Sequence, residues 1–137
     1  MLSPTIDEDF INIEKIISNK NPNLFKIIPN FLISYLKRII HQEELNSAIF
    51  RNKDKIGLDF VDAILKEFGV IIEVHNIENI KNENRLIIAS NHPLGGMDGM
   101  ALLNVVGKFH PNIKFPVNDL LMNLPNLKPL FIPINKH

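Results

Sequence analysis

The sequence predicts an α/β or α+β fold, in which N-terminal helices are followed by strand–loop–helix–strand units that form a mixed sheet covered by helices. Three observations favour this fold class. Apolar residues recur at helical spacing up to residue 68, short apolar runs rich in β-branched residues follow Gly69, and a loop with two adjacent glycines joins one run to another helical segment. This succession is typical of a sheet with helices packed on it.

Length and composition indicate one folded domain over residues 1–137. The chain is 45% hydrophobic and 22% charged, which is ordinary for a globular domain with its own core. We expect residues 1–45 to form a helical part and residues 58–137 to form a catalytic α/β part. Lys plus Arg equals Asp plus Glu at 15 each. The net charge is therefore zero and provides no overall attraction to nucleic acid, so nucleic acid is not expected as a partner.

The first helix is expected near the N-terminus. Thr5 and Glu8 have capping-box spacing, and apolar residues continue at helical spacing to about Ser18. The polar segment at residues 19–23, which contains a proline, should end this helix.

The most regular helical pattern covers residues 28–40, with Pro29 in the first turn, where a helix accepts proline. The apolar positions follow helical spacing without interruption: Ile28, Phe31, Leu32, Tyr35, Leu36, Ile39 and Ile40. The opposite face is polar and basic. Two interpretations stay open: a core helix with a solvated basic face, or an interfacial helix whose stretch from Phe31 to Ile40 contacts a membrane.

A helix over residues 60–68, ended by Gly69, precedes the sheet. A further helix near residues 98–108 and a short helix or turn over 118–123 are expected within the α/β part. The predicted strands cover residues 70–74, 85–90, 113–117 and 130–134. The second of them is apolar enough to lie in the centre of the sheet.

The loop after the second strand contains the residue types needed for acyl transfer to a hydroxyl. The strand would deliver Asn91 and His92 to the carboxyl edge of the sheet, where open α/β sheets bind ligands. Gly95 and Gly96 allow the backbone to turn, so that Asp98 at the start of the next helix can meet His92. The imidazole can then accept the hydroxyl proton while the carboxylate orients the ring.

Other interpretations of these residues stay open. His92 can be an ordinary loop histidine and Asp98 a helix N-cap. The remaining histidines show no metal-ligand spacing, and a metal at His92 and Asp98 would lack a third ligand nearby, so no metal is expected. Ser90, on the strand, is expected to pack rather than to act as a nucleophile.

Residues 91–99, Asn-His-Pro-Leu-Gly-Gly-Met-Asp-Gly, resemble the signature of the glycerol-3-phosphate and lysophosphatidate acyltransferase family. That signature has four residues between the histidine and the aspartate, whereas five separate His92 from Asp98. The longer form is similar to the hemolysin-type branch, which includes bacterial O-acyltransferases that make ornithine and glycine lipids. Residues 21–22, 28–29 and 35–42, and later residues 117–121 and 129–136, also resemble segments of that branch.

The resemblance assigns roles at the end of the chain. Lys136 stands where the wider family has an arginine that binds an anionic acceptor group, and it can offer a point charge to a phosphate or carboxylate. A solvated terminal lysine is the alternative. A later Pro-Glu-Gly block that helps to hold the acceptor does not occur in the sequence. We therefore expect an N-terminal fragment, truncated at its C-terminus and poorly active by itself.

The resemblance implies an O-acyltransferase of bacterial membrane lipid biosynthesis. A fatty acyl chain would pass from a thioester of acyl carrier protein or coenzyme A to the hydroxyl of a lysolipid (lyso-ornithine lipid, lyso-glycine lipid or lysophosphatidate). Backbone N–H groups at Gly95 and Gly96 would stabilise the oxyanion. No tightly bound cofactor is required. Two alternatives stay open: a thioester or ester hydrolase that uses the same pair, and an inactive module that binds a membrane or a partner.

The N-terminal residues indicate the location. Residues 1–9 are acidic where a signal peptide would be basic, and no apolar run approaches the roughly 18–20 residues of a membrane span. We therefore expect a cytoplasmic protein, peripheral on the inner face of the cell membrane.

Overall fold

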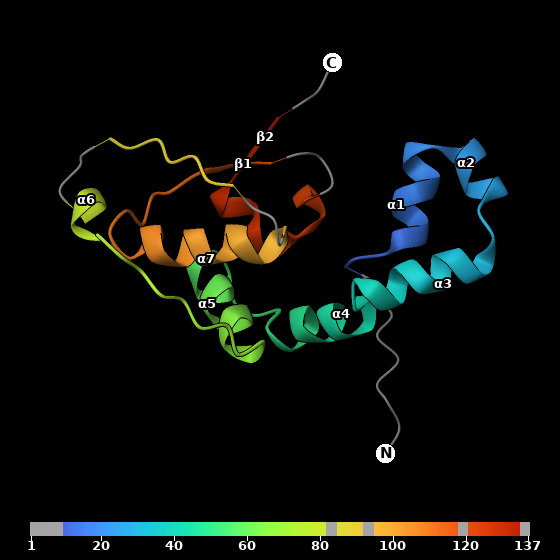
Figure 1. Cartoon of the computed structure of the whole chain (residues 1–137), viewed down its shortest axis with the longest axis horizontal. Coiled ribbons are helices and arrows are strands. Elements are labelled where there is room, and N and C mark those ends of the chain that lie inside the picture. Colours follow the sequence, from blue (N-terminus) through green and yellow to red (C-terminus); the bar gives the residue numbers. More distant parts are fainter. Residues whose placement is uncertain (1–9, 82–84, 92–94, 118–120, 135–137) are drawn as a thin grey trace. The chain divides into compact units, whose positions relative to one another are not determined.

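The computed structural model describes residues 10–81, 85–91, 95–117 and 121–134. The chain divides into two compact units, Met1–Asn52 and Lys53–His137. The first unit is helical in its described part, and the second combines helices with a small parallel sheet (Figure 1). The expected combination of N-terminal helices with a later α/β part is confirmed.

The first unit contains the helices α1 (Ile13–Lys20), α2 (Pro22–Ile27), α3 (Asn30–Ile39) and α4 (Gln42–Arg51). Helix α1 begins later than the capping-box pattern predicted, because the Asn12 side chain caps it by accepting a hydrogen bond from the Lys15 N–H at 3.0 Å. The predicted cap at Thr5 lies outside the described residues. The break after α1 is confirmed, and Asn21 and Pro22 there begin a helix, α2, that the sequence pattern did not predict.

Helix α3 confirms the helix predicted over residues 28–40, but its apolar residues divide between two faces. Ile33 is buried, although it lies outside the predicted apolar stripe, and Leu36 and Ile40 are partly buried. Phe31 and Tyr35 are exposed. The helix therefore packs on one side and presents aromatic and aliphatic side chains on another.

Helix α4 holds the N-terminal segment through two buried amide side chains. Asn46 Oδ1 accepts from the Ile11 N–H, and Asn46 Nδ2 donates to the Ile11 carbonyl, both at 2.8 Å. Gln42 Oε1 accepts from the Ile13 N–H at 3.0 Å. Both amides are buried and hydrogen-bonded, so this polar packing fixes the segment before α1 against α4.

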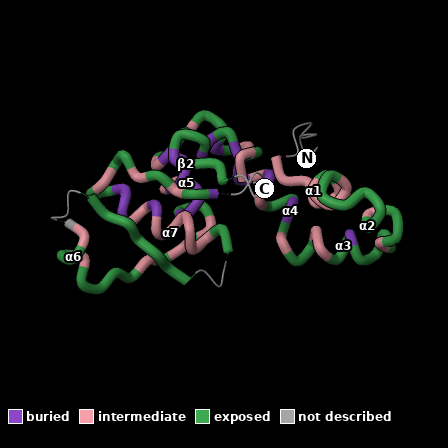
Figure 2. Tube along the Cα trace, turned by 90° about the horizontal axis from the view of Figure 1, so that it is seen from above, coloured by how far each residue is buried: buried purple, intermediate pink, exposed green. Residues whose placement is uncertain are grey.

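The second unit contains α5 (Leu58–Glu67), α6 (Glu78–Lys81), α7 (Gly96–Gly107), β1 (Phe115–Val117), the 3-10 helices η1 (Leu121–Asn123) and η2 (Pro125–Leu130), and β2 (Phe131–Pro133). Its buried apolar residues lie on α5, on α7, at the end of β1, and in or directly before η2. They are Phe60, Val61, Ile64, Leu65, Leu103, Val106, Val117, Leu124, Leu127 and Leu130. Figure 2 shows buried stretches of the trace near α5 and α7. The helix predicted over residues 60–68 is confirmed, and Gly69, with φ of 63°, follows it as expected.

The sheet is smaller than predicted. Strands β1 and β2 are parallel, with Phe115 opposite Phe131, and they confirm the last two predicted strands over shorter lengths. The predicted strands at residues 70–74 and 85–90 are wrong, because neither segment pairs with a described strand. Ile71 is 87% exposed and Ile87 is 99% exposed, so the expected central position of the second segment is also wrong. Apolar β-branched residues favour an extended backbone, but a strand also requires a neighbouring strand with which it can form hydrogen bonds.

Candidate active site

The glycine-containing loop leads directly into α7, as predicted. Gly95 is the N-cap of α7, with φ of 70° and ψ of −121°, and no side chain caps the helix there. A positive φ is accessible to glycine and strained for other residues. Gly96 is the first helical residue and is exposed. The backbone turn that the two glycines were expected to permit is therefore present at Gly95.

Asp98 lies in the first turn of α7 and is partly exposed. Its position near the start of the helix confirms the prediction, whereas the alternative in which it forms the N-cap is wrong, because Gly95 occupies that position. A carboxylate in the first turn is favoured by the partial positive charge of the helix N-terminus. Asp98 is thus held at the end of α7 that follows the loop.

Two predicted site residues, His92 and Lys136, lie outside the described residues. The pairing of His92 with Asp98 and the contact of Lys136 with an acceptor therefore stay predictions. Asn91 is described and exposed, and its carbonyl accepts a hydrogen bond from Ser90 Oγ at 2.8 Å. Ser90 is exposed rather than packed as expected, because the segment before it is not covered by a sheet.

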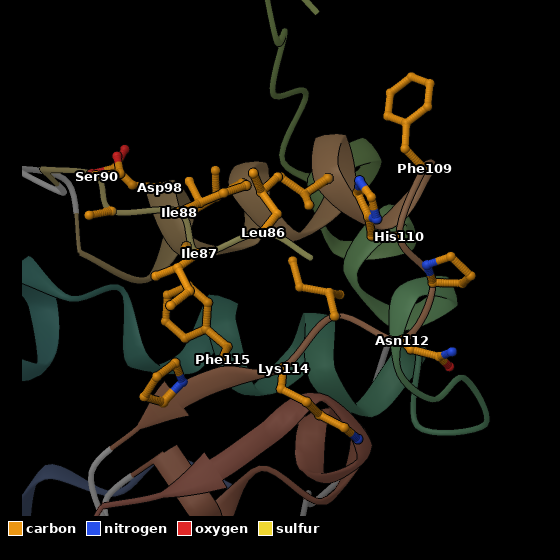
Figure 3. A pocket seen from close by; sticks show the side chains of 17 residues that line it. Leu86, Ile87, Ile88, Ser90, Asp98, Phe109, His110, Asn112, Lys114 and Phe115 are labelled. Atoms are coloured by element: carbon orange, nitrogen blue, oxygen red, sulfur yellow. The ribbon is translucent and has the colours of Figure 1, made fainter. Parts of the chain in front are cut away.

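An open cleft of about 900 Å³ extends from Asp98 along α7. Its walls are mostly apolar and come from residues 86–90, from Leu102 and Val106 of α7, and from residues 109–116. Ser90 and Asp98 lie at one end of the cleft, and His110 lies at the other (Figure 3). The cleft can accept an elongated apolar group with its polar end beside Asp98.

The sequence pattern did not reveal this cleft. Residues 85–90 were expected to form a central strand of the sheet, whereas residues 86–90 are exposed and line the cleft. The available signal was an apolar run directly before the loop, which fits a substrate wall as well as a central strand.

Hydrogen bonds fix the far end of the cleft. The His110 ring nitrogen Nε2 lies 2.8 Å from the Ile80 carbonyl oxygen, which joins the turn after α7 to α6. Lys114 Nζ donates to the Pro129 carbonyl at 2.6 Å, which joins the segment before β1 to η2. These two hydrogen bonds connect the cleft walls to α6 and η2.

The described residues give two further negative findings. Within the described ranges, no group of three His, Cys, Asp or Glu side chains is arranged to hold a metal ion. Of the helices in the described part of the chain, none combines the length and the apolar character of a membrane span.

Comparison with known proteins identifies the family. A family model described as "Acyltransferase" matches residues 15–137. The chain is 47% identical over 127 residues to a lyso-glycine lipid O-acyltransferase of Bacteroides thetaiotaomicron, covering 92% of this chain and 47% of that protein. It is 46% identical, over 92% of this chain and 46% of the relative, to a protein of the same name from Phocaeicola vulgatus. No solved structure matches the chain.

The chain therefore spans about half the length of the curated relatives that it matches. The resemblance seen in residues 91–99 is confirmed by these relatives. Because the family model covers residues 15–137, which are most of the sequence, the chain belongs to the acyltransferase family.

Proposed function

We propose that this protein is an O-acyltransferase that transfers a fatty acyl chain from an acyl thioester to the hydroxyl of a lysolipid in membrane lipid biosynthesis. The observation that carries the proposal is the position of Asp98, which lies in the first turn of α7 at the end of an apolar cleft. The names of the two relatives favour lyso-glycine lipid as the acceptor. Lyso-ornithine lipid and lysophosphatidate are the other candidates.

The chemistry proceeds through one tetrahedral intermediate. His92 accepts the proton of the lysolipid hydroxyl as the oxygen attacks the thioester carbonyl carbon. Asp98 orients the imidazole and stabilises its charged form. The intermediate then collapses, the C–S bond breaks, and the proton passes from His92 to the departing thiolate. The products are an ester-linked acyl chain and a free thiol.

Two features of the described residues support this assignment. The first N–H groups of a helix have no partner within it, so Gly95 and Gly96 at the start of α7 can offer donors to the oxyanion. The apolar walls beside Asp98 suit an acyl chain better than a polar metabolite. The reaction needs no tightly bound cofactor.

The proposal assigns the remaining predicted residues to substrate binding. Asn91, exposed beside the loop, and Lys136 contact the acceptor, and the Lys136 ammonium pairs with a phosphate or carboxylate of its headgroup. The acyl donor is acyl carrier protein or coenzyme A, since both present the chain as a thioester.

We propose further that the protein is cytoplasmic and peripheral on the inner face of the cell membrane, where its lipid acceptor would be found. The contact runs through the segment from Phe31 to Ile40. The exposure of Phe31, Tyr35 and Ile39 on α3 supports this contact.

Lipid profiling tests the proposed function. Cells expressing the full-length gene should accumulate the acylated lipid, and cells expressing the His92→Ala variant should not. With purified full-length protein, release of thiol from an acyl thioester should depend on added lysolipid. Release that is equally fast without lysolipid would identify a hydrolase and contradict the proposal.

A further inference from the structure

His41 is the residue at which helices α3 and α4 meet. Its φ of 51° and ψ of 46° lie in the left-handed region, which residues other than glycine rarely adopt. Ile40, with φ of −82°, ends α3 directly before it, and Gln42 begins α4 directly after it. A left-handed residue cannot continue a right-handed helix, so the chain changes direction at His41. We call this junction the α3–α4 corner.

The local sequence does not require a break at this corner. Residues 30–51 contain neither glycine nor proline. The His41 N–H donates to the Arg38 carbonyl at 3.2 Å, where a continuous α-helix would use the carbonyl four residues earlier. The Leu45 N–H donates to the His41 carbonyl at 2.9 Å, as it would in a continuous helix. A change of backbone conformation at Ile40 and His41 would therefore join the two helices.

Residues 11–14, which we call the strap, are bonded to both helices, one on each side of the corner. On the α3 side, Glu14 Oε1 lies 2.8 Å from the Lys37 ammonium. On the α4 side, the buried side chains of Gln42 and Asn46 form hydrogen bonds of 2.8, 2.8 and 3.0 Å with the strap backbone. The strap therefore fixes the direction of α3 relative to α4.

The strap compensates for strain at the corner. A left-handed conformation is unfavourable for a residue with a Cβ atom, and it persists where the surrounding structure imposes it. Local contacts explain little of it here. Helix α4 has no side-chain cap, and the His41 ring lies 3.4 Å from Glu44, which is on α4 itself and does not span the corner. The bonds of the strap do span it.

We propose that the strap keeps the α3–α4 corner bent, and that release of the strap lets residues 30–51 form one continuous helix. The two forms differ in the backbone of Ile40 and His41 and in the contacts of the strap, so the corner is a two-state element. Straightening would also free the side chains of Gln42 and Asn46 from the strap. The inference goes beyond the proposed function, because it concerns the first unit alone and needs neither acyl donor nor acceptor.

Pulsed electron paramagnetic resonance on the full-length protein tests the proposal. Spin labels at Asn30→Cys and Arg51→Cys mark the outer ends of the two helices, and residues 1–137 contain no natural cysteine. In one continuous helix these two Cα atoms would be about 32 Å apart, and a bend shortens this distance. The labelled parent protein should show the shorter distance. Gln42→Ala with Asn46→Ala, which removes the amide bonds to the strap, should add the longer one.

Substitutions at His41 should then shift the balance in opposite directions. In the variant without the amide bonds, His41→Gly removes the left-handed strain and lowers helix propensity, so it should restore the bent form. His41→Ala should favour the straight form. The ratio of the two forms should differ roughly tenfold or more between these variants. The matched control, Glu43→Ala with Ser47→Ala, adds two alanines to α4 but keeps the amide bonds, and should retain the shorter distance.

Three results would overturn the proposal. A distance that stays short even with His41→Ala would mean that α3 and α4 hold the corner without the strap. A broad range of distances with loss of helicity in circular dichroism would mean unfolding instead of straightening. A longer distance in the control would mean that helix propensity governs the corner. Because these distances are measured without substrate, a failure to transfer acyl chains would contradict the proposed function and not the strap.

Discussion

Gly107 and Leu58 meet where α7 crosses α5. A Cβ atom on Gly107 would lie 2.6 Å from Leu58 Cδ2 and 2.7 Å from Leu58 Cδ1, so the leucine side chain fills the space that a larger residue would need. Gly107 is the last residue of α7, and Asp98 lies in the first turn of the same helix. The close crossing therefore anchors the element that positions the candidate carboxylate.

Replacing Gly107 by alanine should destabilise the protein. Leu58 would have to leave its rotamer, and overpacking of this kind costs roughly 1–3 kcal/mol, against a gain in helix propensity of about 1 kcal/mol. Urea denaturation should show a net loss. Gly99→Ala is the matched control in the same helix, because the added Cβ meets only Phe115, at 3.5 Å, and it should be neutral or stabilising. In a Leu58→Ala background the cost of Gly107→Ala should disappear; a cost that persists would refute this account of the crossing.

Gly95→Ala should impair acyl transfer. The φ of 70° at Gly95 is strained for alanine, so the backbone at the start of α7 would change its conformation. Misplacing reacting groups by about 1 Å can reduce the rate roughly a hundredfold. Gly69→Ala is the control, since Gly69 has φ of 63° and equal open space but follows α5. Gly69→Ala should lower stability without lowering acyl transfer by the purified protein. Equal losses of transfer in both variants would contradict a specific role of the Gly95 backbone in the site.

Asn126 is a buried amide that joins η2 to the segment before α5. The side-chain Nδ2 of Asn126 donates to the Lys55 carbonyl at 2.6 Å and to the Lys53 carbonyl at 3.2 Å. The backbone carbonyl of Asn126 accepts from the Gly57 N–H at 2.7 Å. Asn126→Asp replaces the donor by an acceptor of nearly the same shape. Leaving such buried groups unsatisfied should cost about 1–3 kcal/mol in urea denaturation. The same change at exposed Asn123 should have little effect, and a similar loss there would point to charge rather than hydrogen bonding.

Apolar sequence patterns predicted helices that contain apolar residues at helical spacing. The helix at residues 60–68 was predicted because its buried residues Phe60, Val61, Ile64 and Leu65 have helical spacing. The helix at residues 28–40 was predicted from an apolar stripe that is only partly packed, since Phe31 and Tyr35 are exposed and the buried Ile33 lies outside it. Helix α4 was missed because two of its four buried residues are the amides Gln42 and Asn46, which an apolar pattern does not register. Helix α2 has only 6 residues, too few for a period to be recognised.

The candidate site was predicted in part for a related reason. A glycine at the turn and an aspartate in the first turn of the next helix follow from local sequence, and both were found. The cleft was not, because its walls come from residues 86–90 and 109–116, which approach each other only in the folded unit. Composition at residues 85–90 favoured a strand, but composition cannot specify whether a second strand lies beside the segment.

The ion pair between Asp62 and Lys66 should make a small, acid-sensitive contribution to stability. The hydrogen bond from Lys66, 2.7 Å away, lowers the pKa of the Asp62 carboxyl, and Asn104 assists at 3.4 Å. Because the folded state lowers this pKa, the contribution is present above the unfolded value near 3.9 and is lost as pH falls through the folded value. Asp62→Asn should cost about 0.3–0.5 kcal/mol at neutral pH, an amount typical of exposed pairs. Urea midpoints of wild type and variant should converge in acid, and a constant difference would contradict the ionic origin.

The pairing of His92 with Asp98 can be tested by a double-mutant cycle on full-length protein. If Asp98 acts by orienting the His92 imidazole, Asp98→Asn and His92→Ala should each reduce acyl transfer, by roughly a hundredfold to ten-thousandfold for the loss of a general base. Groups that act as one unit are strongly non-additive, so the double variant should be no slower than His92→Ala alone. Asp62→Asn, which removes a carboxylate from α5 but none from the cleft, should transfer as wild type does. Losses that multiply in the double variant would mean that Asp98 acts independently of His92, for example through the substrate or through the start of α7.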